Sequence, residues 1–100
     1  MILVRTILQA KFGKGGELAK VMANSAGQAA SDSQMRGRVL TDLSGEFDTV
    51  VLEAVHESLA AWEEFRAKLF TTAEFQEGMS RGEGMIVSGR QEFFTIEAEF

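Results

Sequence analysis

Two largely apolar segments of this chain each contain one charged residue near the middle, and the two charges are opposite in sign. Arg5 lies in the apolar run 2–10, and Glu53 lies in the apolar run 49–56. A charge among apolar neighbours must be paired or must face a ligand, because burying it alone is costly. Two readings stay open. The two side chains would form a structural ion pair that fixes how two copies pack, or Arg5 would hold an acidic or enolic oxygen of a small ligand, with Glu53 as a catalytic group.

The single histidine, His56, ends the second of these segments. Imidazole titrates near neutral pH and can bind iron, so His56 is a candidate general base or a single axial ligand of haem. The alternative is a strand-end histidine whose hydrogen bonds are satisfied by the backbone. The chain has no cysteine and no cluster of metal-ligating residue types, so we expect no metal site and no cofactor.

Polar and aromatic side chains near the charged pair extend this candidate site. Gln9 and Thr95 would add hydrogen-bonding groups, and Phe93 would add an aromatic ring, all three as ligand-binding residues. A separate glycine-rich stretch, 13–16, leads into a helix. Its backbone N–H groups would suit an anion, but its spacing matches neither nucleotide-binding fingerprint, which favours a turn that needs positive φ.

The elements that position these residues follow from apolar periodicity. We expect strands at 2–10, 36–43, 49–56 and 91–98, and helices at 15–30 and 58–70. Ser58 is a natural N-cap, and the sequence 71–74 is typical of a capping box, so a short new helix carrying Phe75 should follow. The right-handed connection rule then predicts a ferredoxin-like βαββαβ sandwich, with the third strand between the first and second, in one domain spanning 1–100.

Both faces of the predicted sheet are apolar, although two helices cover only one of them. We assign these residues to the helix side: Val4, Leu8, Val50, Leu52, Phe94 and Ile96. The opposite side then carries Leu3, Arg5, Ile7, Val51, Glu53, Val55, Phe93 and Thr95. A second copy is the simplest cover for such a face, and we therefore expect a homodimer through the sheet faces.

Charge and hydropathy narrow the classes of partner. The net charge of −5 repels phosphate backbones, so nucleic acid is not an expected partner. No apolar run approaches the roughly 20 residues of a membrane span, and the start of the chain does not have the pattern of a signal peptide. We expect a cytoplasmic protein that does not contact membranes.

The sequence as a whole resembles the dimeric α+β-barrel superfamily, which includes antibiotic-biosynthesis-type monooxygenases and NIPSNAP-like proteins. The resemblance lies in residues 7–16 (ILQAKFGKGG), 58–70 (SLAAWEEFRAKLF) and 88–94 (SGRQEFF). It implies a barrel formed by two sheets, with a pocket between sheet and helices in each subunit. Members that oxidise quinols or open haem often carry an asparagine, a tryptophan and a histidine; only the tryptophan has a match, in Trp62, which is thereby a candidate ligand-binding residue. A plain core role is the alternative for Trp62.

Three functions remain open. The first is binding of a small apolar or aromatic ligand, with cofactor-free monooxygenase activity on an electron-rich substrate such as a quinol. The second is a non-catalytic ligand-binding or stress-related interaction protein, and the third is haem binding through His56. Residues 78–89 are broken by glycine yet carry apolar side chains, so they form either a pocket lid or an arm that reaches the partner.

Overall fold

The computed structural model describes residues 1–33 and 35–100, which form a four-stranded sheet and three helices. In chain order these are β1 (Ile2–Ala10), α1 (Gly15–Ser33), β2 (Arg36–Thr41), β3 (Thr49–His56), α2 (Leu59–Leu69), α3 (Ala73–Gly82) and β4 (Ile86–Thr95). The strands lie in the order β2-β3-β1-β4, and all neighbours are antiparallel. The predicted α+β sandwich, with β3 between β1 and β2, is therefore confirmed.

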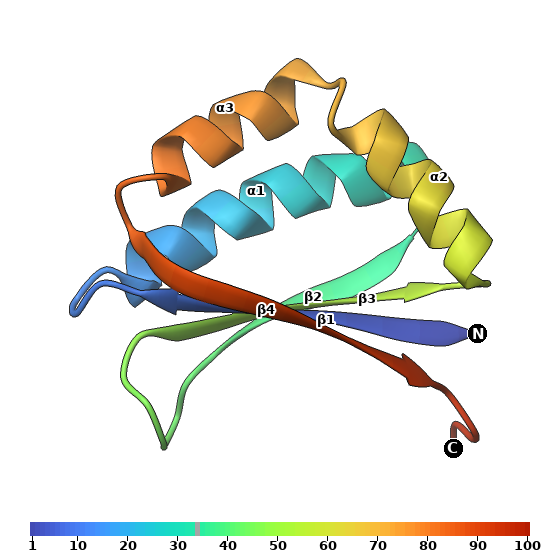
Figure 1. The fold of residues 1–100 in the computed structure, drawn as a ribbon, viewed down its shortest axis with the longest axis horizontal. Helices are drawn as coiled ribbons and strands as arrows, with labels where there is room; N and C mark the ends of the chain where they lie inside the picture. Colours follow the sequence, from blue (N-terminus) through green and yellow to red (C-terminus); the bar gives the residue numbers. More distant parts are fainter. Residues whose placement is uncertain (34) are drawn as a thin grey trace.

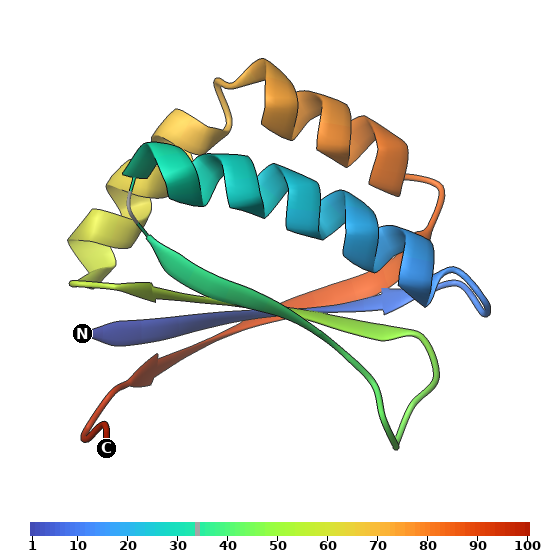
Figure 2. The same cartoon turned by 180° about the vertical axis from the view of Figure 1, so that it is seen from behind.

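All three helices lie on one side of the sheet (Figure 1 and Figure 2). The core forms where α1 meets the sheet, and its most deeply buried side chains are Leu18 and Val50. α1 packs on β2 and β3, and α3 packs on α1 rather than on the sheet. None of the helices among the described residues is long and apolar enough to cross a membrane.

The predicted helix break after α2 is confirmed. Ser58 caps α2 by accepting a hydrogen bond from the backbone N–H of Ala61 at 3.1 Å. The new helix, α3, is capped by Thr72, whose hydroxyl accepts from the N–H of Phe75. The cap thus lies one residue later than the start of the predicted capping box.

The last strand begins earlier than predicted. β4 spans Ile86–Thr95 instead of 91–98, because Ile86 packs against the core and pairs with Ala10 across a β-bulge. Residues 78–89 therefore belong to the end of α3, a turn and the start of β4. The prediction of a glycine-broken loop is wrong, and a role of this segment as a pocket lid or an arm to a partner stays a prediction.

The two faces of β4 are also exchanged relative to the prediction. Phe93 lies opposite Val4, a helix-side residue, and Phe94 lies opposite Leu3 on the other side. Directly paired residues of antiparallel strands point to the same face, so the predicted faces of Phe93, Phe94 and Thr95 are wrong. Apolar alternation could not decide between the two parities, because Phe93 and Phe94 are adjacent and equally apolar.

The glycine-rich turn before α1 is held by a carboxylate from the β2–β3 loop. Asp48 accepts hydrogen bonds from the backbone N–H of Gly13 at 2.8 Å and of Gly15 at 2.9 Å. Gly13 has φ +83°, as the turn reading predicted, and Asp48 itself has φ 60°. The N–H groups that would suit an external anion are therefore occupied by a side chain of the same molecule.

Candidate functional site

The predicted site residues divide between the two faces of the sheet. We call the side without helices the uncovered face. It carries Arg5, Gln9 and Glu53, whereas the helix side carries His56, Trp62, Phe93 and Thr95. The prediction that Phe93 and Thr95 accompany Arg5 is wrong, because the register of β4 turns both to the other side.

On the uncovered face, one glutamate binds two arginines. Glu53 is only 4% exposed, and its two carboxylate oxygens accept from Nε of Arg5 at 2.8 Å and from Nε of Arg38 at 2.7 Å. Burial raises the pKa of the Glu53 carboxyl group, but the hydrogen bonds and charges of Arg38 and Arg5 outweigh it and hold the pKa below its usual range. The predicted ion pair is thus confirmed, and Arg38 is an additional partner.

The ion pair extends to the far edge of the sheet. Arg5 also approaches Glu92 at 3.8 Å, and its guanidinium lies 5.1 Å from the ring centre of Phe94. We call the four residues Arg38, Glu53, Arg5 and Glu92 the charge row; they lie side by side across β2, β3, β1 and β4. Because both oxygens of Glu53 are engaged and its pKa is low, this carboxylate is a poor proton acceptor near neutral pH.

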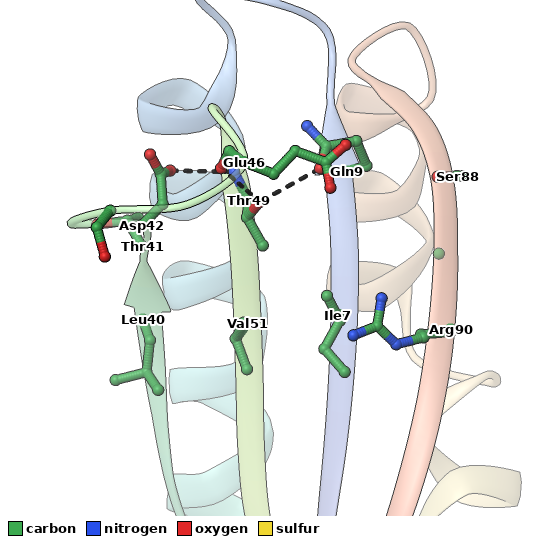
Figure 3. Close-up of a pocket in the computed structure, with 12 residues that line it drawn as sticks. Ile7, Gln9, Leu40, Thr41, Asp42, Glu46, Thr49, Val51, Ser88 and Arg90 are labelled. Atoms are coloured by element: carbon green, nitrogen blue, oxygen red, sulfur yellow. Dashed lines mark hydrogen bonds between the residues drawn. The ribbon is translucent and has the colours of Figure 1, made fainter.

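A hollow of about 590 Å³ lies on the uncovered face, at the end where β2 turns into β3. Figure 3 shows its apolar floor, where Leu40, Val51 and Ile7 stand next to one another on three strands, with Arg90 beside Ile7. Such a volume is in the range of small-molecule sites. However, the hollow is open to solvent on the side of the sheet that faces away from the helices.

The polar groups of this hollow hold the β2–β3 loop. The Gln9 amide donates to the backbone carbonyl of Phe47 at 2.6 Å, and the Thr49 hydroxyl lies within 3.2 Å of the Gln9 amide oxygen (Figure 3). Asp42 accepts from the N–H of Thr49 at 3.0 Å. These contacts give Gln9 a structural role, and its predicted role in ligand binding stays a prediction.

On the helix side, two aromatic rings meet at the far edge of the sheet. The rings of Trp62 on α2 and Phe93 on β4 form a T-shaped pair, with their centroids 4.8 Å apart and their planes at 82°. Phe93 is nevertheless 42% exposed, and α2 has no fully buried residue. We call Trp62 and Phe93 the aromatic shelf.

Cationic and polar groups border the aromatic shelf. The guanidinium of Arg66, one turn along α2, lies 5.8 Å from the ring centre of Trp62. Two residues before Phe93 on the same side of β4, the Gln91 amide donates to the Thr6 hydroxyl at 3.0 Å, and this pair is exposed. Apolar, cationic and hydrogen-bonding groups thus lie around the shelf.

His56 lies on this side too, at the end of β3. Its ring is packed against Phe65 of α2 at a centroid distance of 5.2 Å, and it is 8% exposed. Burial lowers the pKa of His56, so the imidazole is neutral at neutral pH and can accept a proton. Thr95 pairs with Ile2, which in turn pairs with His56, so the three residues lie side by side across β4, β1 and β3 at one end of the sheet.

Three residues of these sites were missed by reasoning from the sequence. Arg38 pairs with Glu53 in the β2–β3 hairpin, and extending the predicted hairpin from its turn would have indicated it. Arg66 follows Trp62 by four residues, and this helical spacing is the signal that could have found it. Asp48 has no local signal, since its partners are 33 and 35 residues away. Among residues 1–33 and 35–100, no group of three or more His, Cys, Asp or Glu side chains could hold a metal ion.

Comparison of the sequence with protein-family models and with curated proteins finds no match. Comparison of the structure finds the same fold in solved proteins. A NIPSNAP domain protein from Burkholderia xenovorans superposes with a TM-score of 0.83 at 18% identity, covering 98% of this chain and 96% of that one. A NIPSNAP family protein from Agrobacterium tumefaciens gives 0.79 at 19% identity, covering 94% and 90%.

Oxygenases and related proteins share the fold as well. A mutant form of SnoaB, a cofactor-independent oxygenase from Streptomyces nogalater, superposes with a TM-score of 0.71 at 17% identity, covering 98% of this chain and 94% of that one. Antibiotic-biosynthesis-monooxygenase-like proteins are also similar. These likenesses confirm the ferredoxin-like α+β fold of the single chain, and at such identities they show the fold alone.

Proposed function

We propose that this protein binds a small aromatic molecule on the aromatic shelf. The exposed ring of Phe93 carries the proposal, because it leaves 42% of an aromatic side chain open on the side of the sheet that the helices cover. Trp62 already forms a T-shaped pair with this ring. A flat ligand would add a further aromatic pair, and each such pair contributes about 0.5–1.5 kcal/mol beyond the area it buries.

The charged neighbour of the shelf indicates the chemical class of the ligand. The Arg66 guanidinium, near the face of Trp62, would pair with a carboxylate or phenolate oxygen carried on an aromatic ring. The Gln91 amide and the Thr6 hydroxyl would exchange hydrogen bonds with a second oxygen. A small aromatic molecule with acidic or phenolic oxygens, such as a hydroquinone, fits these groups.

Fluorescence tests this proposal directly, since Trp62 is the single tryptophan and the chain has no tyrosine. Titration with naphthohydroquinone under nitrogen should change the Trp62 emission in a saturable way. Phe93→Ala should weaken the affinity by about tenfold, because it removes one face of the site. Phe94→Ala is the matched control, since its ring points to the other side of the sheet. An unsaturable signal, or an equal loss in both variants, would refute binding at the shelf.

A second candidate function is cofactor-free oxidation of the bound ligand by dioxygen. It is favoured by His56, a neutral imidazole on the helix side that would take the phenolic proton of a hydroquinone. The electron-rich anion would then react with dioxygen: one oxygen atom enters the ring to give a hydroxyquinone, and the other leaves as water. The ring itself supplies the electrons, so no external reductant is required.

Oxygen uptake separates the two functions. With naphthohydroquinone as substrate, an oxygenase would consume one dioxygen for each hydroxyquinone formed, and His56→Gln would lose the activity while it keeps the Trp62 fluorescence response. If the wild-type protein binds the ligand but consumes no oxygen above the rate without protein, then binding is the function and the oxygenase is excluded.

A further inference from the structure

The hollow on the uncovered face lies over two rows of side chains that differ in character. In the order β2, β3, β1, β4, the first row is apolar except at its end and consists of Leu40, Val51, Ile7 and Arg90. The second row lies nearer the hairpin turn, is polar throughout, and consists of Asp42, Thr49, Gln9 and Ser88. An apolar floor is thus bordered by a cation on β4 and by a carboxylate at the end of β2.

The floor of the hollow is aliphatic. Leu40, Val51 and Ile7 stand side by side on three adjacent strands (Figure 3), so they span about 10 Å across the sheet. Among residues 1–33 and 35–100, no aromatic ring lines the hollow. An extended aliphatic chain laid across this floor would remove apolar surface of both partners from water, which is favourable.

Two carboxylates lie at the hairpin end of the hollow. One oxygen of Asp42 accepts from the N–H of Thr49 at 3.0 Å, and its other oxygen has no hydrogen-bond partner in the described part of the chain. Glu46 lines the same end from the β2–β3 loop (Figure 3). Among the described residues, no basic side chain pairs with either carboxylate. This end of the hollow would therefore attract a cationic group of a ligand.

The opposite edge of the hollow carries a basic side chain, Arg90, which points from β4 toward Ile7 (Figure 3). Its contact with Glu92 is 3.6 Å long, which is beyond hydrogen-bond distance, and the Arg90 side chain is 69% exposed. The guanidinium can therefore bind a ligand carboxylate through two parallel hydrogen bonds. The hydroxyl of Ser88, two residues earlier on the same side of β4, would donate a further hydrogen bond to this carboxylate.

The strand order keeps these two charged ends apart. β3 and β1 lie between β2 and β4, so the backbones that carry Asp42 and Arg90 are separated by about 14 Å at the usual strand spacing. Exposed charges at such a distance are largely screened from each other by salt. A ligand with an opposite charge at each end would meet both groups at once, with its middle over the aliphatic floor.

We infer that the hollow binds a linear aliphatic molecule with an ammonium group at one end and a carboxylate at the other, as in a medium-chain ω-amino acid. The ammonium group would lie near Asp42 and Glu46, and the carboxylate would pair with Arg90 and Ser88. All these residues belong to one chain. The inference goes beyond the proposed function, because the hollow and the aromatic shelf lie on opposite sides of the sheet.

Ligands that lack one of these features satisfy only part of the site. A fatty acid would leave Asp42 and Glu46 without a cation, and an alkylamine would leave Arg90 without an anion. A short peptide has both end groups, but its peptide bonds would lose hydrogen bonds with water over the aliphatic floor, which is costly. The combination of two charged ends and an apolar middle therefore distinguishes the inferred ligand from these three classes.

Calorimetric titration of the full chain with ω-aminooctanoate tests the inference. It should bind about tenfold more tightly than octanoate or octylamine, because each of these lacks one charged end. Shortening the probe to ω-aminohexanoate should weaken binding by about fourfold for each methylene group removed. A single-charge probe or trialanine that binds as tightly as ω-aminooctanoate overturns the inference, and so does a lack of saturable heat with ω-aminooctanoate.

Variants at the two ends should give a crossed pattern with these probes. Arg90→Gln should weaken ω-aminooctanoate by about tenfold and leave octylamine unchanged. The double variant Asp42→Asn with Glu46→Gln should weaken ω-aminooctanoate and leave octanoate no weaker; the asparagine keeps the oxygen that accepts from Thr49. Arg36→Gln is the matched control, since Arg36 lies on the uncovered face but does not line the hollow. An equal loss in Arg36→Gln and Arg90→Gln overturns the inference.

Methyl NMR of the unmodified protein locates the ligand without any substitution. ω-Aminooctanoate should shift the methyl signals of Ile7, Leu40 and Val51, and leave that of Val50 on the helix side unchanged; the opposite pattern overturns the inference. Phe93→Ala should keep these shifts although it loses the naphthohydroquinone response. The failure of the hollow as a site and the failure of the aromatic shelf are thus observed separately.

Discussion

Phe93 and Phe94 are neighbours in the chain but lie on opposite sides of the sheet. The ring of Phe93 meets Trp62 beneath the helices at 4.8 Å, whereas the ring of Phe94 lies 5.1 Å from the guanidinium of Arg5 on the uncovered face. One residue thus contributes to the proposed ligand site and the next to the charged uncovered face. The two roles can therefore be separated by single substitutions.

Glu53→Gln should lower the free energy of unfolding by about 2 kcal/mol, since hydrogen bonds between charged groups contribute about 1.5–3 kcal/mol and both arginines remain partly solvated. Urea unfolding at fixed protein concentration measures the change. Glu92→Gln is the matched control, because its contacts of 3.6 Å and 3.8 Å lie between partly exposed groups and should contribute less than about 1 kcal/mol. Equal losses in the two variants would contradict the role of Glu53 as the centre of the charge row.

The stability from Glu53 should also depend on pH. Its pKa is lower in the folded state than the usual 4.5, so its contribution is complete above that value and is lost as the pH falls through the folded pKa. The free energy of unfolding of Glu53→Gln should therefore decrease less steeply with falling pH than that of the wild-type protein. If the free energy of unfolding falls equally steeply in acid for both proteins, this ion pair does not contribute as described.

His56 should make stability depend on pH in a higher range. Burial lowers its pKa below the usual 6.5, so as the pH falls from that value the unfolded chain binds a proton before the folded one does. Unfolding free energy should thus decrease as the pH falls below about 6.5, and His56→Gln should remove this decrease. Urea unfolding over this range checks the slope; an unchanged slope in His56→Gln would show that another group causes it.

Gly15→Ala should destabilise the turn before α1 by about 1–3 kcal/mol, as overpacking does. A methyl group at this position would lie 2.9 Å from the backbone Cα of Asp48 and 2.8 Å from its carboxylate. Gly16→Ala is the control: it meets nothing within 4 Å and lies in the first turn of α1, so it should be neutral or slightly stabilising. Thermal unfolding compares the two variants, and a tolerated Gly15→Ala would contradict the close approach of Asp48.

The central strands could be predicted because several signals agree on them. The runs 2–10 and 49–56 are apolar apart from a few residues, and a glycine turn joins β2 to β3, so the strands and the pairing of Arg5 with Glu53 as one of two readings follow from the sequence. The register itself comes from the structure, because both faces of these strands are apolar and the hydrophobic pattern does not distinguish them.

The remaining features depend on contacts between distant parts of the chain. The face of Phe93 is determined by its pairing with Val4, which adjacent aromatic residues do not reveal. The clamp formed by Asp48 joins the β2–β3 loop to the start of α1, and no periodicity predicts it. The division of the predicted site into two faces follows from the first of these contacts.

The most direct test of the account is sedimentation velocity in the presence of a coloured naphthoquinone, recorded in the absorption bands of both protein and ligand. Phe93→Ala should sediment without bound ligand, whereas Phe94→Ala should carry the ligand as the wild-type protein does. The reverse pattern, with ligand lost only in Phe94→Ala, would contradict the separate roles of the two faces.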